Sequence, residues 1–77
     1  MIKFTFVAAE DESVDAMTQV TVDGRDVAHI QHCMDGTFVI REELYDNGKF
    51  DGIQDVLGGE HPTLALAISH CKNLYME

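Results

Sequence analysis

Residues 18–40 read TQVTVDGRDVAHIQHCMDGTFVI, and this stretch decides the fold. Val20 and Val22 alternate with polar residues, which is the period of a β-strand that has one face on the core. Asp-Gly pairs follow at residues 23–24 and 35–36, and an Asp-Gly pair between strand-like segments indicates a tight hairpin turn. The stretch therefore predicts three antiparallel strands, over residues 18–22, 26–33 and 37–40.

The length of the first turn decides which side chains face the core. If the turn has two residues, Val20 and Val22 share a face with Val27. If it is a three-residue loop over residues 23–25 with a glycine bulge, they share a face with Ala28 and Ile30. The second register buries the more apolar set, and we prefer it. The core-side residues are then Ala28, Ile30, Met34, Phe38 and Ile40, with His32 pointing inward near the end of the sheet.

Segments on both sides extend this arrangement. Ile2, Phe4 and Phe6 alternate with their neighbours and predict a first strand. A weaker turn signal, Asp-Asn-Gly at residues 46–48, closes the fourth strand. Residues 51–57 predict a short helix, because they carry apolar residues on one helical face and Gly58 follows as a stop signal.

A longer helix is expected at the C-terminal end, where Pro62 suits a first helical position. Its apolar stripe consists of Leu64, Ala67, Ile68, Cys71 and Tyr75. Residues 1–77 thus form one small α+β domain, a four-stranded antiparallel β-meander with one short and one longer C-terminal helix packed on one face. Leu66 lies off the stripe and the edge strands are unpaired, which predicts weak or moderate homodimerisation.

The charge balance restricts the function classes. Fourteen acidic residues against five basic ones give a formal net charge of −9 in a chain that is 45% hydrophobic. A negative field opposes phosphate contacts, so we expect no direct binding to nucleic acid or anionic membranes and expect basic protein surfaces as partners. The chain holds no apolar run long enough for a signal-peptide core or a membrane span, and we expect a cytoplasmic protein, in the host cytoplasm if a phage encodes it.

Metal and catalytic chemistry find little support in the residue pattern. The histidines and cysteines are His29, His32, Cys33, His61, His70 and Cys71. Neighbours on a strand point to opposite faces and neighbours on a helix diverge by about 100°, so neither His-Cys pair can converge on one ion. One ligand from each pair, such as His32 with Cys71, stays an alternative. We expect no metal, no cofactor and no enzymatic activity, because Glu42 and Glu43 also face opposite ways and no phosphate-binding glycine loop is present.

The carboxylates are polarised by the topology of a meander. One end of the sheet carries the candidate partner-binding residues Glu10, Asp11, Glu12, Asp15 and Asp35, with no lysine or arginine in their loops. The opposite end mixes acidic with basic residues: Asp23, Asp26, Glu43, Asp46 and Asp51 with Lys3, Arg25, Arg41 and Lys49. The alternative interpretation is an acidic surface that only keeps a small protein in solution.

The order of elements, with FDGIQDVLGG at residues 50–59 and LALAISHCKNLYM at residues 64–76, resembles small phage-encoded anti-CRISPR proteins, in particular a type I-F inhibitor. This resemblance implies an acidic inhibitor that binds basic nucleic-acid channels, in some cases as a DNA mimic. The chain also resembles the HicB-type antitoxin sensor domain, from which it differs by an extra hairpin and by lacking a DNA-binding extension. Neither resemblance carries over a functional residue.

Two function hypotheses follow. The first is a non-catalytic inhibitor whose acidic end blocks a basic, nucleic-acid-binding surface of a larger complex. The alternative is an antitoxin-like or housekeeping interaction domain that binds through its apolar helix or sheet edge. The salt dependence of binding separates the two, since only the first relies on charge.

Overall fold

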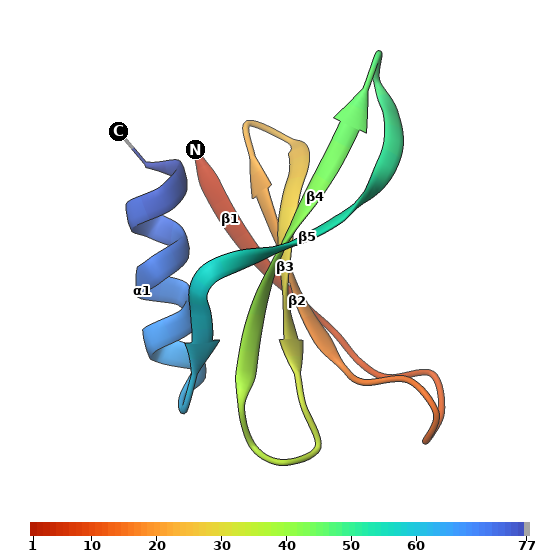
Figure 1. Cartoon of the computed structure of the whole chain (residues 1–77), viewed down its shortest axis with the longest axis vertical. Helices are drawn as coiled ribbons and strands as arrows, with labels where there is room; N and C mark the ends of the chain where they lie inside the picture. The colour runs from red at the N-terminus through yellow and green to blue at the C-terminus, as the bar shows by residue number, and fades with distance from the viewer. Residues whose placement is uncertain (77) are drawn as a thin grey trace.

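The protein is an α+β domain in which one antiparallel sheet carries a helix on one face (Figure 1). The computed structural model describes residues 1–76. The elements, in chain order, are β1 (Ile2–Val7), β2 (Met17–Val22), β3 (Arg25–His32), β4 (Phe38–Asp46), β5 (Lys49–His61) and α1 (Leu64–Tyr75). Each strand pairs with its neighbour in sequence, so the sheet order is β1-β2-β3-β4-β5. The predicted α+β meander is correct, but the sheet has five strands and not four.

The fifth strand replaces the short helix expected at residues 51–57, and that prediction is wrong. A two-residue turn at Asn47 and Gly48, both with positive φ, returns the chain alongside β4 and pairs Asp46 with Lys49. A seven-residue helix is marginal by itself, whereas strand pairing satisfies the backbone groups of both strands. Residues 51–57 therefore pair with β4 as part of a strand and do not form a helix.

A large bulge in β5 explains why residues 51–57 imitate a helix in the sequence. Between the pairs Val39–Glu60 and Arg41–Asp55, β5 carries residues 56–59 where β4 has one residue. The bulge turns Val56 toward the core and leaves Leu57 96% exposed. Gly59 packs closely against the backbone of Val56, so a Cβ added at Gly59 would come within 2.9 Å of the Val56 carbonyl oxygen. The helix-like spacing of the apolar residues in this segment thus comes from a β-strand that a bulge interrupts.

The turn between β2 and β3 has two residues, not the predicted three. Asp23 and Gly24 have φ angles of 51° and 80°, which suits the primed turns that match strand twist. A bulge after Val20 then shifts the register, and Val20 lies opposite Ala28. The predicted core facing is therefore confirmed for Val20 and Ala28, although the bulge lies inside the hairpin and not in the turn.

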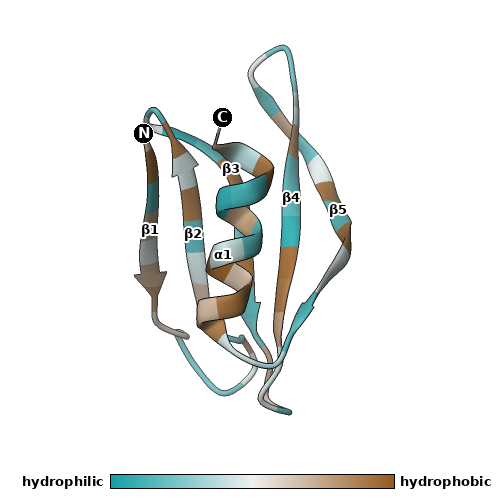
Figure 2. Cartoon of the chain, turned by 90° about the vertical axis from the view of Figure 1, so that its left-hand side faces the viewer, coloured by the Kyte–Doolittle hydropathy of each residue, from teal (hydrophilic) through white to brown (hydrophobic). Residues whose placement is uncertain are grey.

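The core lies between the sheet and α1, which crosses one face of the sheet (Figure 2). Its fully buried residues are Val20, Ala28, Ile30, Ile40, Ala67 and Cys71. Phe38 packs against this cluster and is partly buried. Met34 was expected in the core but is 89% exposed, because it lies in the turn between β3 and β4.

The predicted terminal helix is confirmed, with a small shift at its start. Thr63 is the N-cap, and its side chain accepts a hydrogen bond from the backbone N–H of Leu66. Pro62 consequently lies just before the cap and not at the first helical position. Among residues 1–76, no helix is long and apolar enough to cross a membrane.

Candidate binding surface at the acidic end of the sheet

Three connecting segments meet at one end of the sheet. Val7 pairs with Met17, His32 pairs with Phe38, and Phe38 pairs with His61, so the β1–β2 loop, the β3–β4 turn and the β5–α1 link all lie there (Figure 1). We call residues 8–16, 33–37 and 60–63 the acidic end. It contains no lysine or arginine, and its carboxylates are Glu10, Asp11, Glu12, Asp15, Asp35 and Glu60.

The five predicted partner-binding residues therefore lie at one end of the molecule, and Glu60 joins them. Sequence analysis missed Glu60 because it placed the segment before residue 61 in a helix and a link. The structure places Glu60 on β5, opposite Val39 and one residue before the end of the strand. A strand pattern over residues 49–61 would have brought Glu60 to this end.

Asp11 and Asp35 stabilise the turns in which they lie, because their carboxylates accept hydrogen bonds from residues two positions later. Asp11 Oδ1 accepts hydrogen bonds from the hydroxyl and the backbone N–H of Ser13. Asp35 Oδ1 accepts the same two kinds of bond from Thr37, at 2.6 Å from the hydroxyl and 3.0 Å from the N–H. The side-chain bonds, followed by the backbone bonds, lower the pKa of Asp11 and of Asp35 below the usual value. Both carboxyls are therefore ionised throughout the neutral range.

Asp15 belongs to a row of hydrogen-bonded side chains that crosses the sheet face opposite α1. Gln31 Nε2 donates to Asp15 Oδ2 at 2.6 Å, and Arg41 Nε donates to Gln31 Oε1 at 2.8 Å. Arg41 Nη1 also lies 2.9 Å from Asp55 Oδ1. Arg41 was predicted at the opposite end of the sheet, but it lies in mid-sheet opposite His29. Asp15 thus has a structural partner.

Glu10 and Glu12 differ from these three residues. Both are exposed, and neither makes a hydrogen bond or ion pair within the part of the chain that the structure describes. Their carboxylates can reach a partner without giving up an internal contact. Glu10 and Glu12 are therefore the residues of the predicted set that are best suited to intermolecular contact.

Apolar side chains accompany the acidic ones. A shallow hollow of about 500 Å³ is lined by Asp11, Glu12 and Asp15 together with Val14, His32 and Met34. Val14 is 52% exposed and Met34 89% exposed. Mixed apolar and charged lining is typical of protein-binding surfaces, since apolar contact supplies affinity and charge supplies orientation.

His32, which also lines this hollow, is held by neighbouring side chains. Its ring lies between Phe6 and Phe38, with ring centroids 5.5 and 5.1 Å away. Its Nε2 lies 2.8 Å from the hydroxyl of Thr18, which is buried. The predicted inward position of His32 is confirmed, and these contacts give it a packing role.

The other histidines and cysteines are dispersed. His61 Nε2 and His70 Nδ1 lie 2.9 Å apart and join β5 to α1. Within residues 1–76, no three histidine, cysteine or acidic side chains gather as a metal site would require. Burial raises the pKa of Cys71 to about 11, so its thiol stays protonated and unreactive at neutral pH.

The two adjacent glutamates of β4 point to opposite faces of the sheet. Glu42 accepts a hydrogen bond from Tyr75 on the helix side. Glu43 Oε2 accepts one from Gln19 at 2.7 Å and lies 3.3 Å from His29 Nδ1 on the other side. Glu43 is therefore a mid-sheet residue and not part of the opposite end, where it was predicted.

The remaining residues predicted for that opposite end lie around its two turns. Asp23 binds the N-terminal ammonium group, and the ammonium group, first through the hydrogen bond and then through its charge, lowers the pKa of Asp23. Asp46 and Lys49 are backbone strand partners on either side of the β4–β5 turn. Acidic and basic groups thus alternate here, in contrast to the acidic end.

Comparisons with models of known protein families, with curated proteins and with solved structures find no match for this chain. The resemblances to anti-CRISPR proteins and to the HicB-type sensor domain rest on element order alone. The observed order has a fifth strand where the short helix was expected. Any functional assignment therefore rests on the surface described above.

Proposed function

We propose that this chain is a non-catalytic inhibitor or binding module whose acidic end blocks a basic, nucleic-acid-binding surface of a larger protein complex. The observation that carries the proposal is the gathering of Glu10, Asp11, Glu12, Asp15, Asp35 and Glu60 at one end without a lysine or arginine. Carboxylates spaced along loops can take the lysine and arginine positions that phosphates otherwise occupy. In its finer form the proposal is an anti-CRISPR or DNA-mimic inhibitor acting in the cytoplasm.

The structure of the acidic loops supports a rigid presentation of these charges. The Asp11 and Asp35 carboxylates accept hydrogen bonds from their own turns, and Asp15 is held by Gln31. Glu10 and Glu12 then lie in a loop that these hydrogen bonds partly order. A pre-ordered loop loses less conformational entropy on binding, which strengthens association.

The second candidate function is an interaction domain of the antitoxin or housekeeping type that binds through apolar contacts. The observation in its favour is the exposure of large apolar residues at the acidic end, on the adjoining part of β1 and on the helix, including Met34, Phe6, Leu66 and Leu74. Such contacts would hold a partner in high salt, where charge interactions are screened.

Affinity capture on the immobilised chain, with mass spectrometry of the bound proteins, tests the proposal in its first step. The captured partner is then purified and titrated with the chain in the presence of a DNA or RNA ligand of that partner. We expect the chain to displace the nucleic acid, with an affinity that falls steeply as NaCl is raised. Simultaneous binding of chain and nucleic acid would contradict the proposal, and salt-independent binding would favour the apolar alternative.

A further inference from the structure

β1 forms one margin of the sheet, and within residues 1–76 its outer side pairs with no other strand. Figure 2 shows β1 at this margin, with α1 lying over strands further in. β1 pairs with β2 without a break, from Ile2 opposite Val22 to Val7 opposite Met17. A regular strand with an unpaired side can take up a further strand. We call the outer side of β1 the free edge.

Backbone hydrogen bonds show which residues of β1 turn their polar groups outward. The N–H of Asp23 donates to the carbonyl oxygen of Met1 at 3.0 Å, so these two residues form a hydrogen-bonded pair. Hydrogen-bonded and non-hydrogen-bonded pairs alternate along an antiparallel ladder. Every second residue after Met1 therefore bonds to β2. The residues between them point their N–H and C=O groups to the free edge: Ile2, Phe4 and Phe6.

The hydrogen bonds on the other side of β2 agree with this alternation. The N–H of His32 donates to the carbonyl oxygen of Ala16 at 2.9 Å. This pair continues the register that aligns Thr18 with Ile30, so the backbone groups of Thr18 point to β3. Thr18 is the partner of Phe6 in the pairing of β1 with β2. The backbone N–H and C=O of Phe6 therefore face away from β2.

The side chains of the same three residues share the sheet face that carries α1, because every second residue of a strand points the same way. Ile2 and Phe4 pack against the core. Phe6 lies beyond them and is 62% exposed. A further strand at the free edge would remove part of this aromatic surface from water, which is favourable.

The distribution of charge distinguishes the free edge from the opposite margin of the sheet, which is β5. None of the 14 acidic residues lies within residues 1–9, where Lys3 is the one charged side chain. Two copies of a chain with net charge −9 therefore repel each other least at this edge. β5 instead carries Asp51, Asp55 and Glu60, and the bulge at residues 56–59 interrupts it. Charges and bulges protect a strand against edge pairing, so β1 is the margin suited to a second copy.

We propose that two copies of this chain pair antiparallel through their free edges, with Phe4 opposite the partner's Phe4. This pairing joins two five-stranded sheets into one sheet of ten strands. Ile2 then lies opposite the partner's Phe6, so all three outward-pointing residues of each copy meet one another. A shift by two residues in either direction leaves Ile2 or Phe6 without a partner in β1. The free edge does not include the acidic residues, so this inference does not depend on the proposed function.

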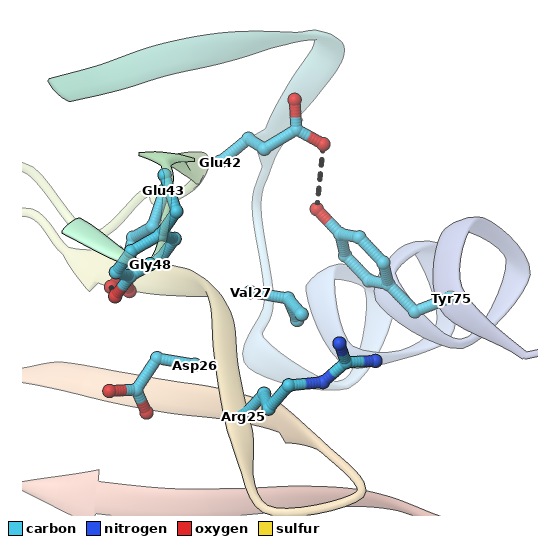
Figure 3. Close-up of a pocket in the computed structure, with 8 residues that line it drawn as sticks. Arg25, Asp26, Val27, Glu42, Glu43, Gly48 and Tyr75 are labelled. Carbon is cyan, nitrogen blue, oxygen red and sulfur yellow. Dashed lines mark hydrogen bonds between the residues drawn. The ribbon is translucent and has the colours of Figure 1, made fainter. Parts of the chain in front are cut away.

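The symmetry of this pairing fixes the arrangement of the dimer. Its two-fold axis runs perpendicular to the sheet, through the pair of Phe4 residues. Both helices then lie on the same face, and the two acidic ends point in opposite directions. α1 stays in place, because it packs against β4 and β5 and the hydrogen bond from Tyr75 to Glu42 holds its last turn to β4 (Figure 3). The dimer therefore carries one acidic end at each of its two ends.

Amide hydrogen exchange of the ¹⁵N-labelled chain at low and high protein concentration tests the inference. We expect the outward amides of Phe4 and Phe6 to exchange quickly in the monomer and to become protected as sedimentation velocity shows the dimer forming. The amide of Thr5 bonds to β2 and should be protected at both concentrations. Monomer at every concentration, or a dimer without added protection at Phe4 and Phe6, would overturn the proposal and leave the free edge to a strand of another protein.

A matched pair of variants tests whether the free edge makes the contact. Phe6→Ala shortens the side chain and keeps the outward N–H, whereas Phe6→Pro also removes that N–H. Proline is tolerated in an edge strand where the N–H faces solvent, so both variants should fold. We expect Phe6→Pro to dimerise more weakly than Phe6→Ala by about tenfold or more, because each copy loses one donor across the edge. Equal dimerisation of the two variants would refute pairing at the free edge.

Cysteine crosslinking tests the register at two exposed positions outside the core. In a Cys33→Ser background, Lys3→Cys chains are mixed with Thr5→Cys chains under mild oxidation. The proposed register places residue 3 directly opposite residue 5 of the other copy, so the mixed disulfide should exceed its statistical share. A shift by two residues would instead pair residue 3 with residue 3, or residue 5 with residue 5. Predominance of either symmetric disulfide would therefore overturn the proposed register.

Discussion

The hydroxyl of Tyr75 donates a hydrogen bond to Glu42 Oε2 at 3.2 Å, and this contact joins the last turn of α1 to the middle of β4. The two residues are 33 positions apart. Burial of the ring, followed by the nearby charge of Glu42 and its hydrogen bond, raises the pKa of Tyr75 well above its usual value. The phenol therefore stays protonated, and the bond persists, over the whole physiological range.

Loss of this contact should weaken the domain measurably. Tyr75→Phe removes the donor and leaves the half-buried Glu42 carboxylate without it, which we expect to lower the free energy of unfolding by about 1 to 2 kcal/mol. Tyr45→Phe is the control, because Tyr45 is 45% exposed and its loss should change stability by less than about 0.5 kcal/mol. Urea denaturation of the three proteins measures the difference. Equal stabilities would mean that the Tyr75 contact contributes nothing.

The position of the core can be tested at Ile30, which is fully buried beneath α1. Ile30→Ala should lower the free energy of unfolding by about 2 to 5 kcal/mol, because the deletion leaves a cavity. Ile53 offers a matched control, since it lies on β5 and is 50% exposed. Thermal unfolding followed by circular dichroism should place the melting temperature of Ile30→Ala well below that of Ile53→Ala. The reverse order would overturn the assignment of the core face.

The two cysteines should differ sharply in reactivity. Cys71 is buried, and burial raises its pKa from 9.0 to about 11, whereas Cys33 is partly exposed. In a Cys33→Ser variant, Ellman's reagent should label the remaining thiol slowly until denaturant is added. Cys71→Ala, which keeps only Cys33, should be labelled quickly in the native state. Similar native-state rates would contradict the burial of Cys71.

The raised pKa of Cys71 also predicts how stability depends on pH. The unfolded thiol ionises near pH 9 and the folded thiol near pH 11, so the unfolded state loses its proton first. The stabilising contribution is complete below pH 9 and is lost as the pH rises toward 11. Denaturation midpoints measured between pH 8 and pH 11 should therefore fall, and a constant midpoint would contradict this interpretation.

Charge reversal at the acidic end tests the proposed binding surface. Glu10→Lys with Glu12→Lys alters two exposed carboxylates that have no internal partner, and we expect it to abolish capture of the basic partner while the fold is retained. Asp46→Lys with Asp51→Lys shifts the net charge equally at the opposite end of the sheet and should cost much less affinity. Asp11 is left intact because it builds its own turn. Equal losses would assign the effect to overall charge.

Self-association of the chain also stays a prediction. The outer edge of β1 is unpaired in the sheet, and Leu66 is 50% exposed on α1. We expect a weak dimer that sedimentation velocity detects at high concentration, and that salt strengthens by screening the net charge of −9. Monomer alone at every concentration and salt would contradict this.

Local signals in the sequence were sufficient for much of the fold. The Asp-Gly pair at residues 23–24 specifies a hairpin because glycine and aspartate accept positive φ, and the stripe from Leu64 to Tyr75 specifies a helix. The position of the bulge after Val20 could not be predicted, because it depends on how β2 and β3 twist together. The facing of Val20 was correct because burial, and not turn length, sets the register.

The misassigned segment shows where such signals fail. Ile53, Val56 and Leu57 have helical spacing, but β4 offers hydrogen-bond partners along the segment's length, and the bulge at residues 56–59 breaks the alternation that would identify a strand. The same error concealed Glu60 at the acidic end. The loop positions of Glu10 and Asp35 followed from the hairpin topology alone, whereas the contact between Tyr75 and Glu42 could not be foreseen, because it joins two residues 33 positions apart.

The strict sequence order of the sheet has a consequence for how the chain folds. Every strand pairs with the one before or after it, and the turns at residues 23–24 and 47–48 are short, so each of these hairpins closes with little loss of loop entropy. Hairpins of this kind form within microseconds. Docking of α1, by contrast, brings Tyr75 back to Glu42 and requires most of the sheet to be in place. We therefore expect the apolar sheet face to stay hydrated until α1 docks, and we expect helix docking, and not strand pairing, to complete the native state.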